Sequence, residues 1–196
     1  MSEYEFTADY LSHNIWRWEK IYQYLSSNFG SDLNCLEIGT FEGRSAIYLL
    51  DNFVGDSGKL TVIDQFKYNP VKSRYLRNMN FHPKHNQVKT LIGLSFIELA
   101  KLYEQQSEFD FIYIDAGKSA GDNLVNLMLA ERILKVGGII VVDDYQWDNL
   151  PDPKHCPRLG IDSFIKLTLL SEVFMEGYQM VFKKIKDNEE LKKFNK

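Results

Sequence analysis

Short apolar runs alternate along this chain with longer segments of helical periodicity, and this alternation constrains the fold more than any other feature. The runs are rich in Val, Ile, Leu and Phe, and they span residues 33–38, 59–63, 87–92, 109–114 and 138–142. The segments between them, at about 44–54, 70–80, 95–106 and 121–135, are long enough to be crossover helices between parallel strands. We therefore predict an α/β domain built on a doubly wound parallel sheet.

Both ends of the chain add to this core. Two further strand candidates, 172–175 and 178–182, are separated only by Glu176 and Gly177, which suits a tight antiparallel hairpin. With them the sheet becomes seven-stranded, mostly parallel and Rossmann-like. We expect the 196 residues to form a single domain, with a helical lead-in over 1–28, an α/β core over 29–186 and a charged tail over 187–196.

Charge and hydropathy narrow the classes of function. The formal net charge is −4, with 23 basic and 27 acidic residues interspersed, which argues against duplex nucleic acid as the main partner. Uncharged runs stay well short of the roughly 18 residues of a membrane span, and the start lacks a basic leader. Cys35 and Cys156 fit a reduced protein better than a disulfide scaffold. We expect a soluble cytoplasmic protein that binds neither nucleic acid nor membrane.

A glycine-containing segment after the first predicted strand indicates a ligand site, because ligands of open parallel sheets bind outside the carboxyl ends of the strands. In the run Glu37-Ile-Gly-Thr-Phe-Glu-Gly43, Gly39 and Gly43 permit a sharp turn and close approach of the backbone to a ligand. The spacing differs from the G-x-G-x-x-G fingerprint of NAD-binding folds. An NAD-linked oxidoreductase is therefore a minor alternative.

Four motifs carry a resemblance to a known family. They are Glu37–Ala46, Gly93-Leu-Ser95, Ile114-Asp-Ala-Gly-Lys118 and Gly137–Asp144. Together with Asp64 at the end of the second strand, they resemble the class I S-adenosylmethionine-dependent methyltransferases, in particular the small O-methyltransferases of the catechol and caffeoyl-CoA type. The ending Gly177-Tyr-Gln179 is similar to that of a related bacterial methyltransferase group. The resemblance covers roughly residues 33 to 147 and implies S-adenosylmethionine as cofactor and a small-molecule hydroxyl as acceptor.

The resemblance also implies which residues bind the cofactor. Asp64 is expected to accept hydrogen bonds from both ribose hydroxyls, with a helix N-cap as the alternative role of this residue. Residues 40, 41 and 45 are implied around the methionine end, and residues 93, 95 and 96 near the adenine, although Phe66 and Phe96 could equally be core. The full predicted set is Glu37, Gly39, Thr40, Phe41, Gly43, Ser45, Asp64, Gly93, Ser95, Phe96 and Asp115.

The catalytic candidates are Asp115, Lys118, Asp143 and Asp144, which lie at the ends of the fourth and fifth predicted strands. Carboxylates crowded together repel one another unless a cation neutralises them. In the resembled family the residues matching Asp115, Asp143 and Asp144 hold Mg²⁺, and the one matching Lys118 is the general base. This chain has Asp144 where that family usually has Asn, and Lys118 where the bacterial group tends to have His.

Other polar residues are weaker candidates for the site. The spacing of His82 and His85 could chelate a metal, but the Pro-containing stretch around them is typical of a solvated turn. The segment 146–158 holds three of the five prolines and is expected to overhang the catalytic face. The residues expected to contact the acceptor are Tyr145, Trp147 and Arg158. Trp16 and Trp18 either close the pocket or pack in the core.

Three functions therefore compete. The first is a metal-assisted O-methyltransferase, the second a metal-independent methyltransferase of another small-molecule acceptor, and the third a non-catalytic S-adenosylmethionine-binding module. The intact residues Asp115, Lys118, Asp143 and Asp144 count against the third. The acceptor itself is left open, and a homodimer is the assembly to test.

Overall fold

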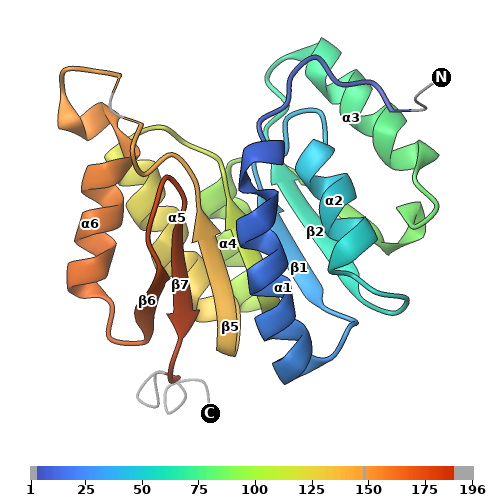
Figure 1. The fold of residues 1–196 in the computed structure, drawn as a ribbon. Coiled ribbons are helices and arrows are strands. Elements are labelled where there is room, and N and C mark those ends of the chain that lie inside the picture. The colour runs from blue at the N-terminus through green and yellow to red at the C-terminus, as the bar shows by residue number, and fades with distance from the viewer. Residues whose placement is uncertain (1–3, 148, 188–196) are drawn as a thin grey trace.

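The computed structural model describes residues 4–147 and 149–187 and confirms the predicted architecture. Seven strands form one sheet in the order β3-β2-β1-β4-β5-β7-β6 (Figure 1). All neighbouring strands are parallel except the two pairs that involve β7. The strands are β1 (Asn34–Ile38), β2 (Lys59–Asp64), β3 (Val88–Ile92), β4 (Phe109–Ile114), β5 (Leu134–Val142), β6 (Ser171–Met175) and β7 (Met180–Lys184).

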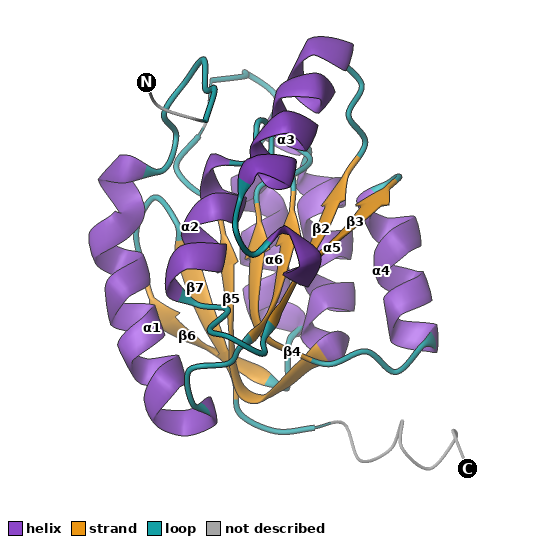
Figure 2. Cartoon of the chain, turned by 90° about the vertical axis from the view of Figure 1, so that its right-hand side faces the viewer, coloured by secondary structure: helices purple, strands orange, loops and turns teal. Residues whose placement is uncertain are grey.

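Helices cover both faces of this sheet (Figures 1 and 2). One face packs against α1 (Ile15–Phe29), α2 (Arg44–Asn52) and α3 (Asn69–Phe81). The other packs against α4 (Ser95–Glu104), α5 (Ala120–Ile133) and α6 (Pro157–Leu167). Successive strand residues alternate between the two cores: Phe111 lies in the first and Ile112 in the second. Such alternation is what a strand buried on both faces requires.

The C-terminal strands differ from the predicted tight hairpin. β6 ends at Met175 and β7 begins at Met180, so four residues join them instead of two. The backbone N–H of Tyr145 donates to the carbonyl of Tyr178 at 2.9 Å. The segment is therefore drawn toward the end of β5 and leaves the ladder between β6 and β7. β5 is also longer than predicted, because it begins at Leu134 directly after α5.

The N-terminal lead-in is only partly helical. A short 3₁₀ turn spans Ser12–Asn14 ahead of α1, whereas residues 4–11 form a non-helical segment that we call the N-terminal strap. Hydrogen bonds hold the strap against the loop that precedes α2. Thr7 donates its backbone N–H and its hydroxyl to the Glu42 carboxylate in that loop, at 2.6 and 2.7 Å. Residues 1–3, and 188–196 of the predicted tail, lie outside the described residues.

Two local predictions from the sequence hold only in part. The turn expected around His82 is present, but His82 itself is not solvated: its imidazole is buried, and its Nε2 lies 3.0 Å from Asp51 Oδ1 at the end of α2. His85 is exposed. The loop expected over 146–158 ends in α6, with Pro157 in the first helical turn, where its missing N–H costs nothing. None of the described helices is long and apolar enough to cross a bilayer.

The contact between α5 and α6 predicts a sharp difference between two glycines. A Cβ at Gly160 would lie 2.0 Å from the carbonyl oxygen of Ala120, whereas one at Gly121 would meet only the Ser119 hydroxyl at 3.9 Å. We expect Gly160→Ala to lower the free energy of unfolding by about 1–3 kcal/mol through overpacking, measured by denaturant titration. The control Gly121→Ala should leave stability unchanged or raise it by up to about 1 kcal/mol. Equal stabilities of the two variants would contradict the packing of α6.

Candidate functional site

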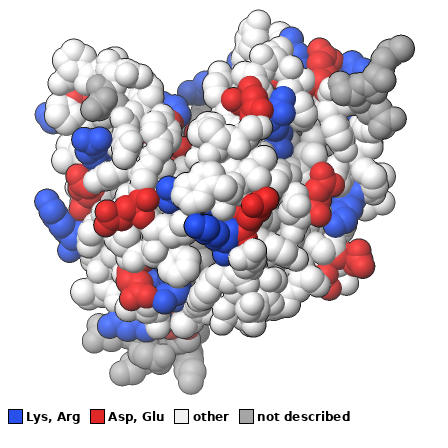
Figure 3. All heavy atoms as spheres, in the orientation of Figure 1, with Lys and Arg blue, Asp and Glu red and all other residues white. Residues whose placement is uncertain are grey.

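A cavity of about 690 Å³ lies at the carboxyl ends of the parallel strands, where an open α/β sheet binds ligands. Loops after β1, β2, β3 and β4 line it, and Figure 3 shows the molecule hollowed at this edge, between the sides that carry α6 and α3. A smaller cavity adjoins it and shares Gly39, Phe41 and Asp115. Nine of the eleven predicted cofactor residues line one or both cavities, namely Gly39, Thr40, Phe41, Ser45, Asp64, Gly93, Ser95, Phe96 and Asp115.

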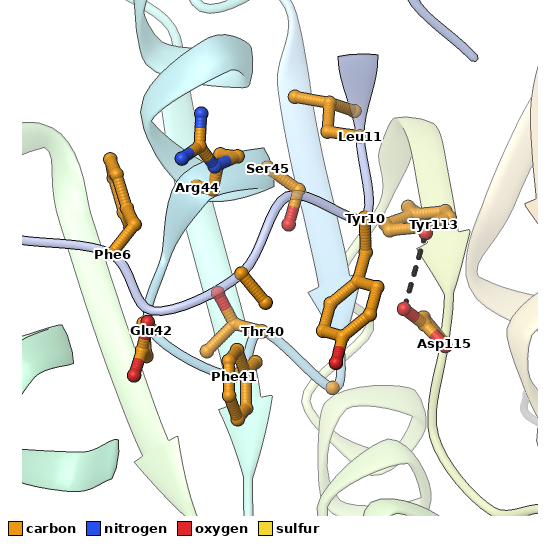
Figure 4. Close-up of a pocket in the computed structure, with 12 residues that line it drawn as sticks. Phe6, Tyr10, Leu11, Thr40, Phe41, Glu42, Arg44, Ser45, Tyr113 and Asp115 are labelled. Carbon is orange, nitrogen blue, oxygen red and sulfur yellow. Dashed lines mark hydrogen bonds between the residues drawn. The ribbon is translucent and has the colours of Figure 1, made fainter. Parts of the chain in front are cut away.

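The N-terminal strap roofs the smaller cavity. Figure 4 shows the strap crossing the loop that follows β1, with Tyr10 beside Phe41; their rings meet edge to face at 5.8 Å between centroids. Phe6 lies under the guanidinium of Arg44, 4.4 Å from ring centroid to Cζ. Sequence reasoning missed this roof, because a strap held by tertiary contacts carries no periodic signal.

Gly39 and Gly43 adopt the turn conformation that the sequence predicts, and packing within the protein adds a second need for glycine. Gly39 has φ +85°, and a Cβ on it would lie 2.3 Å from the carbonyl oxygen of Asp115. Gly43 has φ +87°, and its Cβ would meet Tyr75 and Met79 at 3.0 Å. Gly39 also lines both cavities, and its approach to a ligand stays a prediction. The close packing brings the loop after β1 against the loop after β4.

Asp64 joins two of the cavity's loops. Its Oδ2 accepts the backbone N–H of Thr40 at 2.9 Å, and its Oδ1 accepts that of Phe66 at 2.7 Å. The residue capping α3 is Tyr68, so Asp64 is not the helix cap that the sequence allowed. Its carboxylate lines the larger cavity, and its binding of a ribose stays a prediction. Of the two aromatic candidates, Phe66 is buried in the core and also lines the larger cavity, whereas Phe96 is 41% exposed on its wall.

Glu37 is a buried carboxyl group beside the smaller cavity. Its Oε1 accepts the hydroxyl of Ser45, a cavity-lining residue. Within the described residues, neither Glu37 Oε2 nor the nearby Thr40 hydroxyl has a well-formed hydrogen bond, although the Thr40 hydroxyl lies close enough to favour the ionised form of Glu37. Burial raises the pKa of Glu37 to about 8; the Ser45 and Thr40 hydroxyls act in the opposite direction, and the charges of Asp115 and Asp64 add to the rise. Buried polar groups are normally paired, so these atoms are suited to a polar or cationic ligand group.

The predicted catalytic residues do lie together. The ammonium of Lys118 contacts the Asp144 carboxylate and lies 3.4 Å from Asp115 Oδ1. Burial, followed by the charge of Asp143, raises the pKa of Asp115 to about 6, while Lys118 acts in the opposite direction. Asp115 also lines both cavities. We call Asp115, Asp143 and Asp144 the acidic cluster. Through Asp115, this cluster borders the space expected to hold the cofactor.

Asp143 is held by residues that the sequence analysis did not select. Its Oδ2 accepts the hydroxyl of Tyr113 at 2.5 Å and the side-chain amide of Gln179 at 3.0 Å. Its Oδ1 accepts the backbone N–H of Asp144 at 2.8 Å. The one available signal for Tyr113 is its place two residues before Asp115, since alternate residues of a strand point to the same face. In an apolar strand, however, the sequence pattern predicts that a Tyr packs in the core.

The carboxylates of Asp115, Asp143 and Asp144 have the chemistry that a hard cation needs, but they are not arranged as a metal site. Carboxylate oxygens are the ligands that Mg²⁺ prefers. Across residues 4–147 and 149–187, however, no three Asp, Glu, His or Cys side chains are grouped so as to hold a metal ion. The positive charge next to Asp115 and Asp144 comes from Lys118.

Two of the three predicted acceptor contacts, Tyr145 and Arg158, are hydrogen-bonded within the protein, and contact of any of the three with an acceptor stays a prediction. The Tyr145 hydroxyl donates to Asp162 Oδ1 at 2.9 Å, and Arg158 Nε donates to the carbonyl of Tyr145 at 3.2 Å. They tie the segment after β5 to α6, and neither they nor Trp147 are among the described residues lining the two cavities. Trp18 is fully buried, so of the two predicted roles it packs in the core and does not close the pocket. Trp16 is about half exposed.

Comparison with protein-family models places this site in a known group. Residues 36–145, more than half of the chain, match a model described as a methyltransferase domain. The chain belongs to this methyltransferase family. The match runs from β1 to Tyr145, the residue after Asp144. It therefore covers the segments that build both cavities, apart from the strap.

Individual relatives agree with this assignment. The methyltransferase is 28% identical over 157 residues to a caffeoyl-CoA O-methyltransferase of Populus kitakamiensis; the match covers 74% of this chain but only 64% of that protein's length. An O-methyltransferase of Bacillus cereus, solved in complex with SAH, shares its fold with a TM-score of 0.68 at 22% identity, covering 87% of this chain and 81% of the other. The O-methyltransferase TomG of Streptomyces achromogenes, involved in tomaymycin synthesis and solved with SAM, gives 0.65 at 19%, covering 80% and 74%.

The raised pKa of Glu37 predicts a pH-dependent stability of the methyltransferase. The folded protein keeps the proton up to about pH 8, whereas an ordinary Glu loses it near 4.5. The contribution of Glu37 to stability is therefore complete below pH 4.5 and is lost progressively as the pH rises to 8. Glu37→Gln should remove this dependence, so that unfolding free energies at pH 5 and 8 differ by roughly 3–5 kcal/mol less than in the wild type.

The measurement is denaturant unfolding at both pH values. Glu19→Gln, which changes an exposed carboxylate on α1, is the control and should keep the wild-type dependence. A Glu37→Gln protein with the same pH dependence as the wild type would show that Glu37 is ionised in the folded state.

Proposed function

We propose that this methyltransferase transfers the methyl group of S-adenosylmethionine to a hydroxyl group of a small-molecule acceptor. The observation that carries the proposal is the position of Asp115, which lines both cavities and contacts Lys118. A cofactor in the cavities would have its reactive end beside the acidic cluster. The relatives named as O-methyltransferases support the class of reaction.

The cofactor has four chemical parts, and each has a matching region. Asp64 would accept hydrogen bonds from the ribose, and residues 93–96 would contact the adenine at the far side of the larger cavity. The smaller cavity would take the methionine end, where the unpaired oxygens of Glu37 and Thr40 suit its ammonium group. The sulfonium would then face Asp115. An ammonium group bound there would favour the ionised form of Glu37, and the resulting carboxylate would stabilise the cation in a site shielded from water.

The transfer itself is an in-line displacement whose rate depends mostly on positioning. The acceptor oxygen attacks the methyl carbon while the S–C bond breaks and leaves S-adenosylhomocysteine. Lys118 would take the hydroxyl proton at Nζ after giving up its own proton, a loss that a divalent cation bound beside it would favour. Its side chain is about half exposed, so an acceptor entering from solvent can reach it.

A divalent cation is part of the proposal because of the chemistry of the donor set. Asp115, Asp143 and Asp144 would have to shift from the arrangement described here to hold it, because they are not grouped as a metal site in the described residues; three carboxylates nevertheless carry more negative charge than Lys118 balances. When bound, Mg²⁺ would neutralise these carboxylates and polarise the reacting hydroxyl. The homodimer and the cytoplasmic location expected from the sequence also stay predictions.

The cofactor assignment predicts a specific loss of affinity. S-adenosylhomocysteine should bind one site per chain and raise the melting temperature, because a ligand selective for the folded state stabilises it. Asp64→Asn should weaken binding by about 1–3 kcal/mol in calorimetry, through loss of a charged acceptor. Asp51→Asn, which changes a carboxylate bonded to His82 away from the cavities, should bind like the wild type. Equal affinities of Asp64→Asn and wild type would remove the ribose role, and absence of any binding would overturn the proposed function.

The catalytic assignment predicts how activity depends on Lys118 and on metal. We expect turnover of at least one member of a diol panel that includes catechol and caffeoyl-CoA, with radiolabelled methyl transfer as the measurement. Lys118→Ala should lose turnover and keep its affinity for S-adenosylhomocysteine, and Lys118→Arg should not restore it, because a guanidinium stays protonated. Activity should vanish in EDTA and return with Mg²⁺ or Mn²⁺. Full activity in EDTA would remove the cation from the proposal and leave methyl transfer standing.

A further inference from the structure

The four residues between β6 and β7, which we call the β6–β7 turn (176–179), reach the two carboxylates that follow β5. The hydroxyl of Tyr178 donates to Asp144 Oδ1 at 2.9 Å. The amide nitrogen of Gln179 donates to Asp143 Oδ2 at 3.0 Å, and both Gln179 and Asp143 are buried. The ending Gly177-Tyr-Gln179, which the proposed reaction does not use, therefore holds two residues of the acidic cluster.

Helix α1 determines which way the Gln179 amide points. The indole Nε1 of Trp18 donates to Gln179 Oε1 at 3.0 Å. An indole N–H can only donate, so the amide oxygen must face Trp18 and the amide nitrogen must face Asp143. Trp18 is itself fixed, since it is fully buried and its ring packs edge to face on Tyr113 at 4.7 Å between centroids.

The turn is also fastened to α1 through Arg17. This buried side chain donates from Nη1 to the carbonyl of Glu176 at 3.2 Å. A Cβ at position 177 would lie 2.3 Å from Arg17 Nη2, so a larger residue there would require the guanidinium to shift. Two neighbouring residues of α1 thus hold the turn in place, although the described residues that line the two cavities include none from this helix.

We propose that Gln179 and Tyr178 are positioning residues of the methyl transfer: Gln179 orients Asp143, Tyr178 orients Asp144, and Trp18 orients Gln179. The inference rests on the proposed function, because it needs these carboxylates to act in the reaction. Tyr113 donates to the same Asp143 oxygen as Gln179, so that oxygen sits between two fixed donors. Asp144 in turn contacts Lys118, and an error of about 1 Å in such a contact can cost a factor of about 100 in rate.

Two conservative variants test the proposal. Gln179→Glu keeps the size of the side chain and an acceptor for Trp18, but turns a carboxylate oxygen toward Asp143. Tyr178→Phe removes only the hydroxyl that holds Asp144. Each should lower kcat on catechol or caffeoyl-CoA by about 10–100-fold, the range found when groups that orient active-site carboxylates are removed. KM for the acceptor and the dissociation constant of S-adenosylhomocysteine should stay within twofold of the wild type.

The matched control is Tyr24→Phe, which removes another hydrogen bond between α1 and the sheet, from the Tyr24 hydroxyl to the carbonyl of Gly137. It should leave kcat unchanged. A merely structural role for Gln179 would lower the melting temperature and cofactor affinity together with kcat. That pattern, or a kcat of Gln179→Glu within twofold of the wild type, would overturn the proposal.

A second readout does not depend on the acceptor. If the wild type turns over none of the probes, the proposed acceptor class fails, and crystal structures of wild type and Gln179→Glu with S-adenosylhomocysteine then decide the positioning role. A carboxylate of Asp143 rotated away from the Tyr113 hydroxyl in the variant supports the inference. An unchanged Asp143 overturns it.

Discussion

The close approach of two backbones, at Gly39 and Asp115, determines the layout of the site. No side chain separates the loop after β1 from the loop after β4, because a Cβ at Gly39 would lie 2.3 Å from the Asp115 carbonyl oxygen. These loops leave neighbouring strands at the point where the strand order reverses. Asp64 extends the same assembly to β2 through its hydrogen bond to Thr40. The cofactor-sized cavity and the acidic cluster are therefore adjacent as a direct result of backbone packing.

Three carboxyl groups in this small region, two of them buried and that of Asp115 partly exposed, are stabilised in three different ways. Glu37 retains a proton, as its pKa of about 8 indicates. Asp143 accepts hydrogen bonds from a tyrosine, an amide and a backbone N–H. Asp115 lies beside Lys118, yet its pKa remains raised to about 6. The region thus has negative charge that is only partly balanced, which favours a cationic ligand such as a sulfonium or a metal ion.

The sequence was most informative where the pattern is local. Apolar runs predict strands, and strand ends predict the site, so the sequence correctly places Asp64, Asp115, Lys118 and the pair after β5 at one edge of the sheet; their roles stay predictions. The roles of Tyr113 and Gln179 could not be found this way, because a buried strand residue and a turn residue acquire their partners only through tertiary packing. The same holds for His82, which packs on α2, and for the strap held by Glu42. At Gly39 the pattern predicted the turn, which the positive φ confirms, but not the close packing against the Asp115 carbonyl, which depends on the tertiary structure.

The central claim is that the cavity at the strand ends binds S-adenosylmethionine next to the acidic cluster. A crystal structure of the protein with S-adenosylhomocysteine tests it most directly. The account predicts both ribose hydroxyls within hydrogen-bond distance of the Asp64 carboxylate, with the sulfur atom facing Asp115 and Lys118. A ligand bound outside the two cavities, or one whose ribose lies away from Asp64, would contradict it.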